Sequence, residues 1–207
     1  MNVEKLQQLL ADRVPSPSLV YCLDLWQKLP FDFKLRKTRM TKVGDFTFRT
    51  GKRIQITVNR DLHPYLFLMT YVHEVAHHYV HAAYGHRIQS HGEEWKRKFQ
   101  ELMTPVLKEE VFPEPIFSHL KRHMLDPMAS SFSDSELTRL FRSYDQNEKE
   151  KIVLSQLPEG SIFSLNKRWF KKGKVRRTRV LCSEVKTKRQ YLIPLDSLVG
   201  EAQLSIL

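Results

Sequence analysis

Cysteine is scarce in this chain, long apolar stretches are absent, and each shortage excludes a class of protein. The two cysteines among the 207 residues, Cys22 and Cys182, both have apolar neighbours. Two thiols cannot form a disulfide framework or a four-cysteine zinc site, so we expect buried thiols in a reducing compartment. No apolar run approaches the ~18 residues of a membrane span, and the start of the chain lacks the apolar core of a signal peptide. We therefore expect a soluble, cytoplasmic protein with no membrane partner.

Acidic residues are almost missing from one basic segment near the C-terminus. Between Ser161 and Tyr191 there are eleven Lys or Arg residues and one acid, Glu184, so this segment has a net charge of +10. The remaining residues contribute only +1 of the formal charge of +11. We therefore expect the partner of this segment to be anionic.

The most informative stretch is the His-Glu-x-x-His run at residues 73–77. The apolar spacing around it predicts a helix over about residues 64–83, between a proline and a glycine. Histidines four residues apart share one helix face, so His73 and His77 are candidate ligands of one metal ion. Glu74 lies beside them as a candidate base for a metal-bound water.

A zinc site that does chemistry needs a third protein ligand and one open position. His78 points about 100° away from His77 around the helix, and His81 lies about 12 Å from His73 along the helix axis. The metzincin spacing also fails, because it would need glycine at position 80 and histidine at position 83. The third ligand is therefore expected from the chain that follows the helix.

His91 is the preferred third ligand. Ser90 and Glu93 predict a capping box that opens a second helix, and a histidine at the start of that helix would be firmly held. A carboxylate from the second helix is the alternative. The candidates for that role are Glu94 and Glu101.

These motifs resemble the SprT-like metalloprotease family, which includes the Spartan DNA–protein crosslink proteases. The resemblance covers roughly residues 1–108 and rests on the strand-like segment 53–59, the run at 73–77 and the sequence His-Gly-Glu-Glu-Trp at 91–95. It implies a Zn2+ ion bound by His73, His77 and His91, with Glu74 as the catalytic base. Many bacterial members add a four-cysteine zinc ribbon, which this chain cannot form.

The pattern of elements predicts an α+β fold. We expect a zincin-like domain over residues 1–110, with a small sheet and the active-site helix across it. A connecting segment with short helices follows over 111–159. The last part, 160–207, is a small basic β-rich subdomain that lacks zinc-ribbon cysteines, with turns predicted at 172–174 and 186–188.

Basic residues in this last subdomain alternate with aromatic ones, a combination that suits phosphates and stacked bases. We therefore predict DNA, possibly single-stranded, as its partner; RNA or an acidic protein is a weaker alternative. The candidate contact residues are Lys167, Arg168, Trp169, Lys171, Lys172, Lys174, Arg176, Arg177, Arg179, Lys186, Lys188 and Arg189.

Two functions follow from these patterns. The first is a zinc-dependent endopeptidase of SprT-like type that acts on DNA-associated proteins, with Glu74 activating the water. The second is a nucleic-acid-binding protein whose metal site is structural or vestigial. Glu74 favours the first function, because a purely structural site needs no base.

Overall fold

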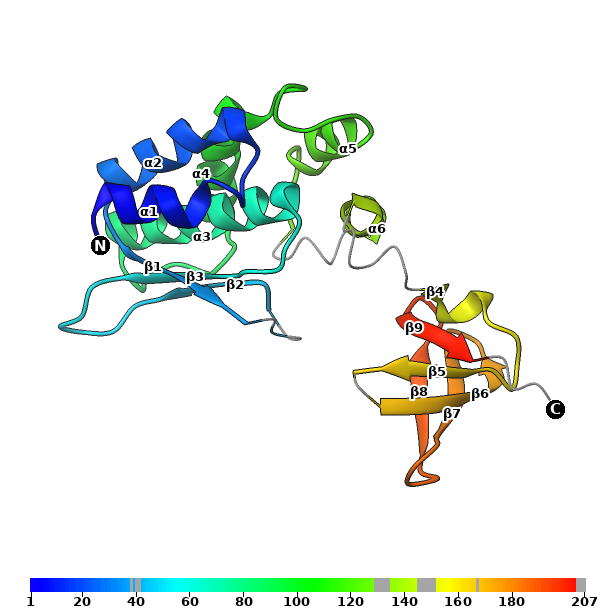
Figure 1. The fold of residues 1–207 in the computed structure, drawn as a ribbon. Coiled ribbons are helices and arrows are strands. Elements are labelled where there is room, and N and C mark those ends of the chain that lie inside the picture. Colours follow the sequence, from blue (N-terminus) through cyan, green and yellow to red (C-terminus); the bar gives the residue numbers. More distant parts are fainter. Residues whose placement is uncertain (38, 40–41, 129–134, 145–151, 167, 204–207) are drawn as a thin grey trace. The chain divides into compact units, whose positions relative to one another are not determined.

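The computed structural model describes residues 1–37, 39, 42–128, 135–144, 152–166 and 168–203, and it divides into two compact units (Figure 1). The N-terminal unit comprises residues 1–142 and the C-terminal unit residues 143–207. Helices and a small mixed sheet in the first unit, followed by an antiparallel sheet in the second, confirm the predicted α+β fold class. Within the described ranges, no helix is long and apolar enough to cross a membrane.

The sheet of the N-terminal unit has the strand order β1-β3-β2. β1 (Asp32–Arg36) runs parallel to β3 (Gln55–Asn59), and β2 (Gly44–Thr47) pairs antiparallel with β3. The last four residues of β3 are buried, as expected for a central strand under a layer of helices. β2 is an edge strand of this sheet, and it borders the candidate metal centre described below.

Helices cover one face of this sheet (Figure 1). α3 is the longest, and its sequence explains both ends: Pro64 occupies the first turn, where its missing N–H costs nothing, and Gly85 ends the helix at φ +69°. The helices of this unit are α1 (Val3–Leu10), α2 (Leu19–Lys28, after a 3-10 turn at Ser16–Ser18), α3 (Pro64–Tyr84), α4 (Glu93–Met103), α5 (Ile116–His123) and α6 (Ser135–Tyr144), the last of which extends past the unit's end.

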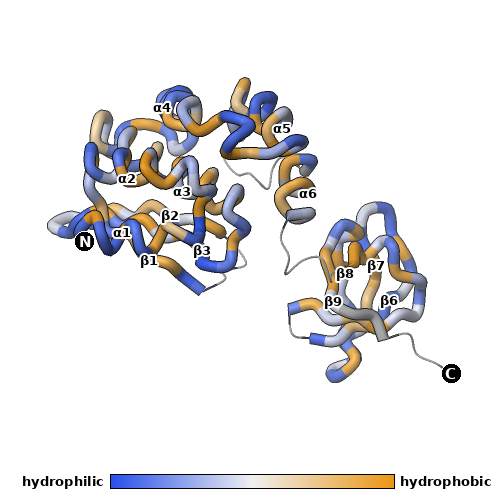
Figure 2. The backbone as a smooth tube through the Cα atoms, turned by 45° about the horizontal axis from the view of Figure 1, so that its top comes forward, coloured by the Kyte–Doolittle hydropathy of each residue, from blue (hydrophilic) through white to orange (hydrophobic). Residues whose placement is uncertain are grey.

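Hydrophobic and hydrophilic residues alternate along most of these helices, as Figure 2 shows, so those helices can bury one face, whereas α3 is buried on most of its sides. Phe67, Tyr71 and Val75 of α3 are fully buried, and side chains of this size each contribute about 1.5–3 kcal/mol when they leave water. The Tyr71 hydroxyl donates a hydrogen bond of 3.0 Å to the carbonyl oxygen of Cys22 in α2. Packing and hydrogen bonding thus fix the orientation of α3, and with it the direction of its histidines.

The C-terminal unit is a six-stranded antiparallel sheet with the order β4-β9-β5-β6-β7-β8. Its core combines Leu154, Phe163, Phe170 and Val180 with the free thiol of Cys182. The strands are β4 (Ile152–Val153), β5 (Ile162–Leu165), β6 (Arg168–Arg176), β7 (Arg179–Glu184), β8 (Gln190–Pro194) and β9 (Leu198–Gln203).

The turn predicted at residues 172–174 is wrong, because these residues lie inside β6. The pairing with β7 shifts between Lys172 and Val175, which marks a bulge. A Cβ at Gly173 would lie 2.4 Å from the carbonyl oxygen of Leu181, so this glycine permits a close approach of two strands. The turn predicted at 186–188 does lie between two strands, β7 and β8.

Candidate metal centre

Three histidine side chains converge between α3 and the start of α4. The Nε2 atoms of His73 and His77, one turn apart on α3, are 3.2 Å apart. The Nε2 atom of His91 lies 2.9 Å from that of His77 and 3.2 Å from that of His73. Among the residues that the structure describes, this is the one group of three or more His, Cys, Asp or Glu side chains arranged to hold a metal ion.

The donor set fits a zinc ion. Nitrogen ligands about 2.05 Å from a tetrahedral zinc lie about 3.3 Å from one another, close to the separations observed here. Burial and mutual repulsion lower the pKa of His73 well below its usual value, and lower that of His77 to about 3. Burial also lowers the pKa of His91. The rings are therefore neutral at pH 7, which is the form that binds metal.

The backbone at His91 is strained in order to bring its ring to the cluster. His91 has a φ of +60°, a left-handed conformation that costs a residue with a Cβ about 1–2 kcal/mol. The next residue, Gly92, donates its N–H to the carbonyl oxygen of Gln89 at 3.0 Å, which closes a tight turn before α4. Strain of this kind persists only where surrounding packing over-determines it.

Trp95 of α4 provides this packing. It is fully buried, and its ring centroid lies 4.6 Å from that of His73, 5.3 Å from that of His77 and 4.7 Å from that of His91. One indole thus contacts all three imidazoles. Sequence analysis named Trp95 only as the last residue of the sequence His-Gly-Glu-Glu-Trp, because a sequence motif does not show what a side chain contacts.

The predicted capping box at Ser90 is wrong. α4 begins at Glu93, and its N-cap is Gly92, which makes no side-chain capping bond. Ser90 is therefore too early in the chain to cap the helix, and its Oγ lies 3.3 Å from Nδ1 of His91. A contact to Nδ1 leaves Nε2 as the ligand atom of His91.

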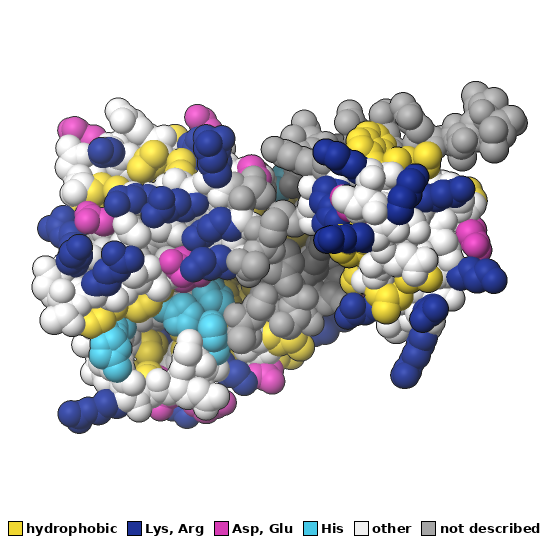
Figure 3. All heavy atoms as spheres, turned by 90° about the horizontal axis from the view of Figure 1, so that it is seen from below, with side chains coloured by type: hydrophobic (Ala, Val, Ile, Leu, Met, Phe, Trp, Pro, Cys, Tyr) yellow, Lys and Arg dark blue, Asp and Glu magenta, His cyan; other side chains and the backbone are white. Residues whose placement is uncertain are grey.

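The other ligand candidates lie outside the cluster. His78 is buried edge-on against Phe31, with ring centroids 5.7 Å apart, and His81 packs against Phe48 at 4.5 Å. Glu101 forms an ion pair with Lys98, and neither it nor Glu94 belongs to the three-histidine group. Histidine side chains gather on one face of the N-terminal unit, with hydrophobic atoms between them (Figure 3).

Glu74 is buried against the edge strand β2. Its side chain is 7% exposed, and the backbone N–H of Phe46 favours the charged form of its carboxylate. Burial, followed by the nearby charge of Asp45, raises the pKa of Glu74 to about 8, while the positive charge of Arg39 acts in the opposite direction. A carboxyl group with a pKa near neutrality can both accept and donate a proton at pH 7.

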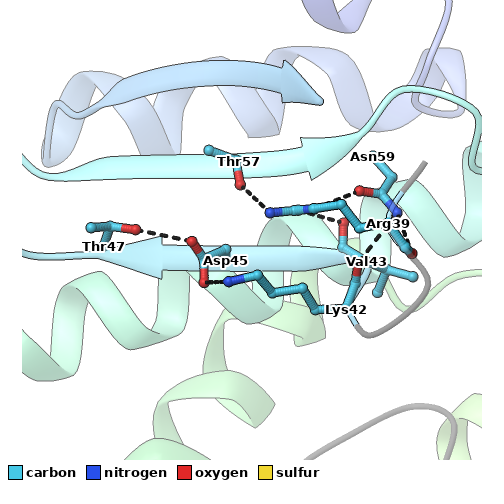
Figure 4. Close-up of polar contacts among 7 residues, drawn as sticks. All are labelled: Arg39, Lys42, Val43, Asp45, Thr47, Thr57 and Asn59. Carbon is cyan, nitrogen blue, oxygen red and sulfur yellow. Dashed lines mark hydrogen bonds and ion pairs between the residues drawn. The ribbon is translucent and has the colours of Figure 1, made fainter. Parts of the chain in front are cut away.

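Arg39 is held by the sheet beside this site (Figure 4). It donates hydrogen bonds to Oδ1 of Asn59 at 2.9 Å and to Oγ1 of Thr57 at 3.1 Å, and both partners are buried. Lys42 forms an ion pair of 2.6 Å with Asp45 of β2. Sequence analysis missed these residues, because they come close to Glu74 only through the pairing of strands, and no sequence motif marks such a contact.

An α+β domain with an His-Glu-x-x-His helix and a third histidine at the start of the next helix has the features of a zincin-type metal centre. Residues 23–113 match the model of the SprT-like family, so the chain contains a SprT-like family domain over these residues. The family generally consists of metalloproteases. No curated protein and no solved structure matches the chain.

The candidate nucleic-acid contacts differ in their surroundings. Lys172 is buried, and its ammonium donates to the carbonyl oxygens of Leu154, Ser155 and Leu157, so a phosphate cannot reach it. Arg168 pairs with Glu184 at 2.6 Å. Lys167 lies outside the described residues. The basic side chains that are exposed to solvent are Arg168, despite its ion pair, and Lys171, Lys174, Arg176, Arg177, Arg179, Lys186, Lys188 and Arg189, with Trp169 beside them at 45% exposure.

Proposed function

We propose that this protein is a zinc-dependent endopeptidase of the SprT-like type that acts on DNA-associated proteins. The observation that carries the proposal is the convergence of three imidazole nitrogens within 3.2 Å of one another, beside a buried Glu74. Three neutral nitrogens leave a divalent cation its full charge and one open position, the arrangement of hydrolytic rather than structural zinc sites.

His73, His77 and His91 would hold the zinc ion. A zinc ion bound there supplies Lewis acidity, which makes water more acidic and polarises a peptide carbonyl group. Glu74 would accept the proton of the attacking water at its carboxylate and pass that proton to the nitrogen of the departing amine. Glu74 is buried against β2, and the Phe46 N–H favours the charged form of its carboxylate, which is the form that accepts a proton.

The position of β2 at the edge of the sheet is an argument for a peptide as the substrate. In the order β1-β3-β2, one side of β2 pairs with β3, so this strand, which contacts Glu74, lies at the border of the sheet. Edge strands bind extended peptides by backbone hydrogen bonds. A substrate aligned in this way would run past Glu74 without any demand on its own side chains.

The exposed cations of the C-terminal unit support DNA as the partner. One group lies around the β6–β7 turn and comprises Lys174, Arg176, Arg177 and Arg179, and another lies in the β7–β8 turn and comprises Lys186, Lys188 and Arg189. The two groups are at opposite ends of the six residues of β7, about 20 Å apart at 3.3 Å per residue. Trp169 is half-exposed and lies near the β7–β8 turn, where it offers a stacking surface for a base.

Cleavage of a DNA-bound protein by the wild type and by Glu74→Gln tests the enzymatic part. We expect the variant to keep its zinc and to lose about 100-fold or more of its activity, since general base catalysis is worth that much. Equal cleavage by the two proteins would remove Glu74 as the base, and no cleavage by either would leave a DNA-binding protein with a structural metal site. Competition by single-stranded DNA, duplex DNA and RNA at one salt concentration tests the partner, and binding that ignores salt would refute the electrostatic basis.

A further inference from the structure

Gly44 of β2 lies directly beneath the carboxylate of Glu74. A Cβ atom added at Gly44 would be 2.3 Å from Oε1 of Glu74 and 2.9 Å from its Cδ. The same Cβ would lie 2.7 Å from Cγ2 of Thr70, one turn earlier on α3. Real Cβ atoms essentially never lie closer than 3.0 Å to a neighbour, so a larger residue at this position requires a shift, and the carboxylate of Glu74 is the nearest group to give way.

The backbone of Gly44 does not itself require glycine. Gly44 lies in a regular strand, paired with Val58 of β3, and it is not among the glycines with positive φ, which are Gly51, Gly85 and Gly160. Glycine inside a strand weakens the strand, so its presence there marks a close approach. The group that approaches here is the carboxylate of Glu74.

We infer that Gly44 is a positioning residue for Glu74. The missing side chain admits the carboxylate to the surface of β2, where it packs directly against the backbone of the strand. A side chain at residue 44 would occupy the volume in which the carboxylate of Glu74 now lies. The inference rests on the proposed function only where it concerns catalysis.

A double-mutant cycle on stability tests the contact without any measurement of activity. In the full-length protein, Gly44→Ala should lower Tm by roughly 5 °C through overpacking. In a Glu74→Ala background, where the carboxylate is gone, the same change should lower Tm by less than half as much. Equal shifts in the two backgrounds would overturn the inference. Should Gly44→Ala fail to fold, a soluble Gly44→Ala/Glu74→Ala protein supports the contact and an insoluble one overturns it.

Zinc content and cleavage then separate positioning from general damage. Gly44→Ala should bind zinc as the wild type does and lose about 100-fold in cleavage, because its base is displaced. Adding Thr70→Ser removes the second clash while keeping the hydroxyl that donates to Leu66 O, so this control should recover less than half of the Tm loss and none of the cleavage. Wild-type cleavage by Gly44→Ala would overturn the inference. A wild type that cleaves nothing would refute the proposed function, and the stability cycle would still decide the role of Gly44.

Discussion

Replacing Lys172 by methionine should unfold the C-terminal unit readily, although lysines are normally tolerant surface residues. Lys172 is 4% exposed, and its ammonium donates to the carbonyl oxygens of Leu154 at 2.8 Å, Ser155 at 3.4 Å and Leu157. These carbonyls belong to the 3-10 turn Leu154–Gln156 and the residue after it. Methionine preserves the apolar stem but leaves the turn without its donor.

The size of the effect follows from the two closest carbonyls. A buried acceptor that loses its donor costs about 1–3 kcal/mol, and removal of a buried charge returns part of this cost. We therefore expect Lys172→Met to lower the free energy of unfolding by about 2–4 kcal/mol. The unit spans residues 143–207, and in a unit of this size such a loss lowers Tm by roughly 10 °C or more.

Hydrogen–deuterium exchange of peptides from β6 and β7 measures this stability in the full-length chain. The matched control is Lys171→Met, the exposed neighbour on the same strand, which should leave exchange unchanged. DNA binding should respond in the opposite way. Lys171→Met should weaken DNA binding, whereas Lys172→Met should not weaken it under conditions in which the variant is fully folded. If Lys172→Met exchanges like Lys171→Met, or weakens DNA binding to the same extent while folded, the structural role of Lys172 is wrong.

Two further predictions concern charge in the C-terminal unit. Hydrogen bonds from Arg168 and Thr187 lower the pKa of Glu184 to about 2, from an ordinary value of 4.5. The wild type should therefore be more stable than a Glu184→Gln variant above about pH 4.5, and this difference should vanish as the pH falls toward 2. Urea midpoints of both proteins at pH 7, 4 and 2.5 measure the difference, and a constant difference would refute the prediction. Replacing Lys186, Lys188 and Arg189 by glutamine should remove three phosphate contacts. The slope of log affinity for DNA against log salt should then fall by about 2.7, at about 0.9 per contact. An unchanged slope would show that the β7–β8 turn is not part of the interface.

The long amphipathic segments were predictable because their periodicity is local. Proline and glycine at the two ends of α3 specify its length within one residue, and the spacing of His73 and His77 on one face follows from helix geometry alone. His91 was preferred after His78 and His81 had been excluded, because a capping box was expected to hold it, and the structure places it in the cluster without that capping box. Its left-handed backbone could not be foreseen, since nothing in the local sequence demands φ +60° there.

The features that sequence reasoning missed depend on contacts between strands. Lys172, Gly173 and Lys174 have the composition of a turn, and only the approach of the Leu181 carbonyl shows that Gly173 serves a bulge within β6. Lys172 was grouped with the other cations for the same reason, because burial of its ammonium depends on a turn some 15 residues earlier. Gly44 matters only because α3 presses Glu74 onto β2.

Zinc content tests the central claim most directly. We expect one tightly bound zinc ion in the wild type and in His81→Ala, whose histidine lies on α3 outside the cluster. His91→Ala, which removes one of three ligands, should bind zinc at least about 100-fold more weakly in a competition with a chelator. If His91→Ala holds zinc as firmly as the wild type does, His73, His77 and His91 do not form one metal centre, and the proposed hydrolytic function loses its basis.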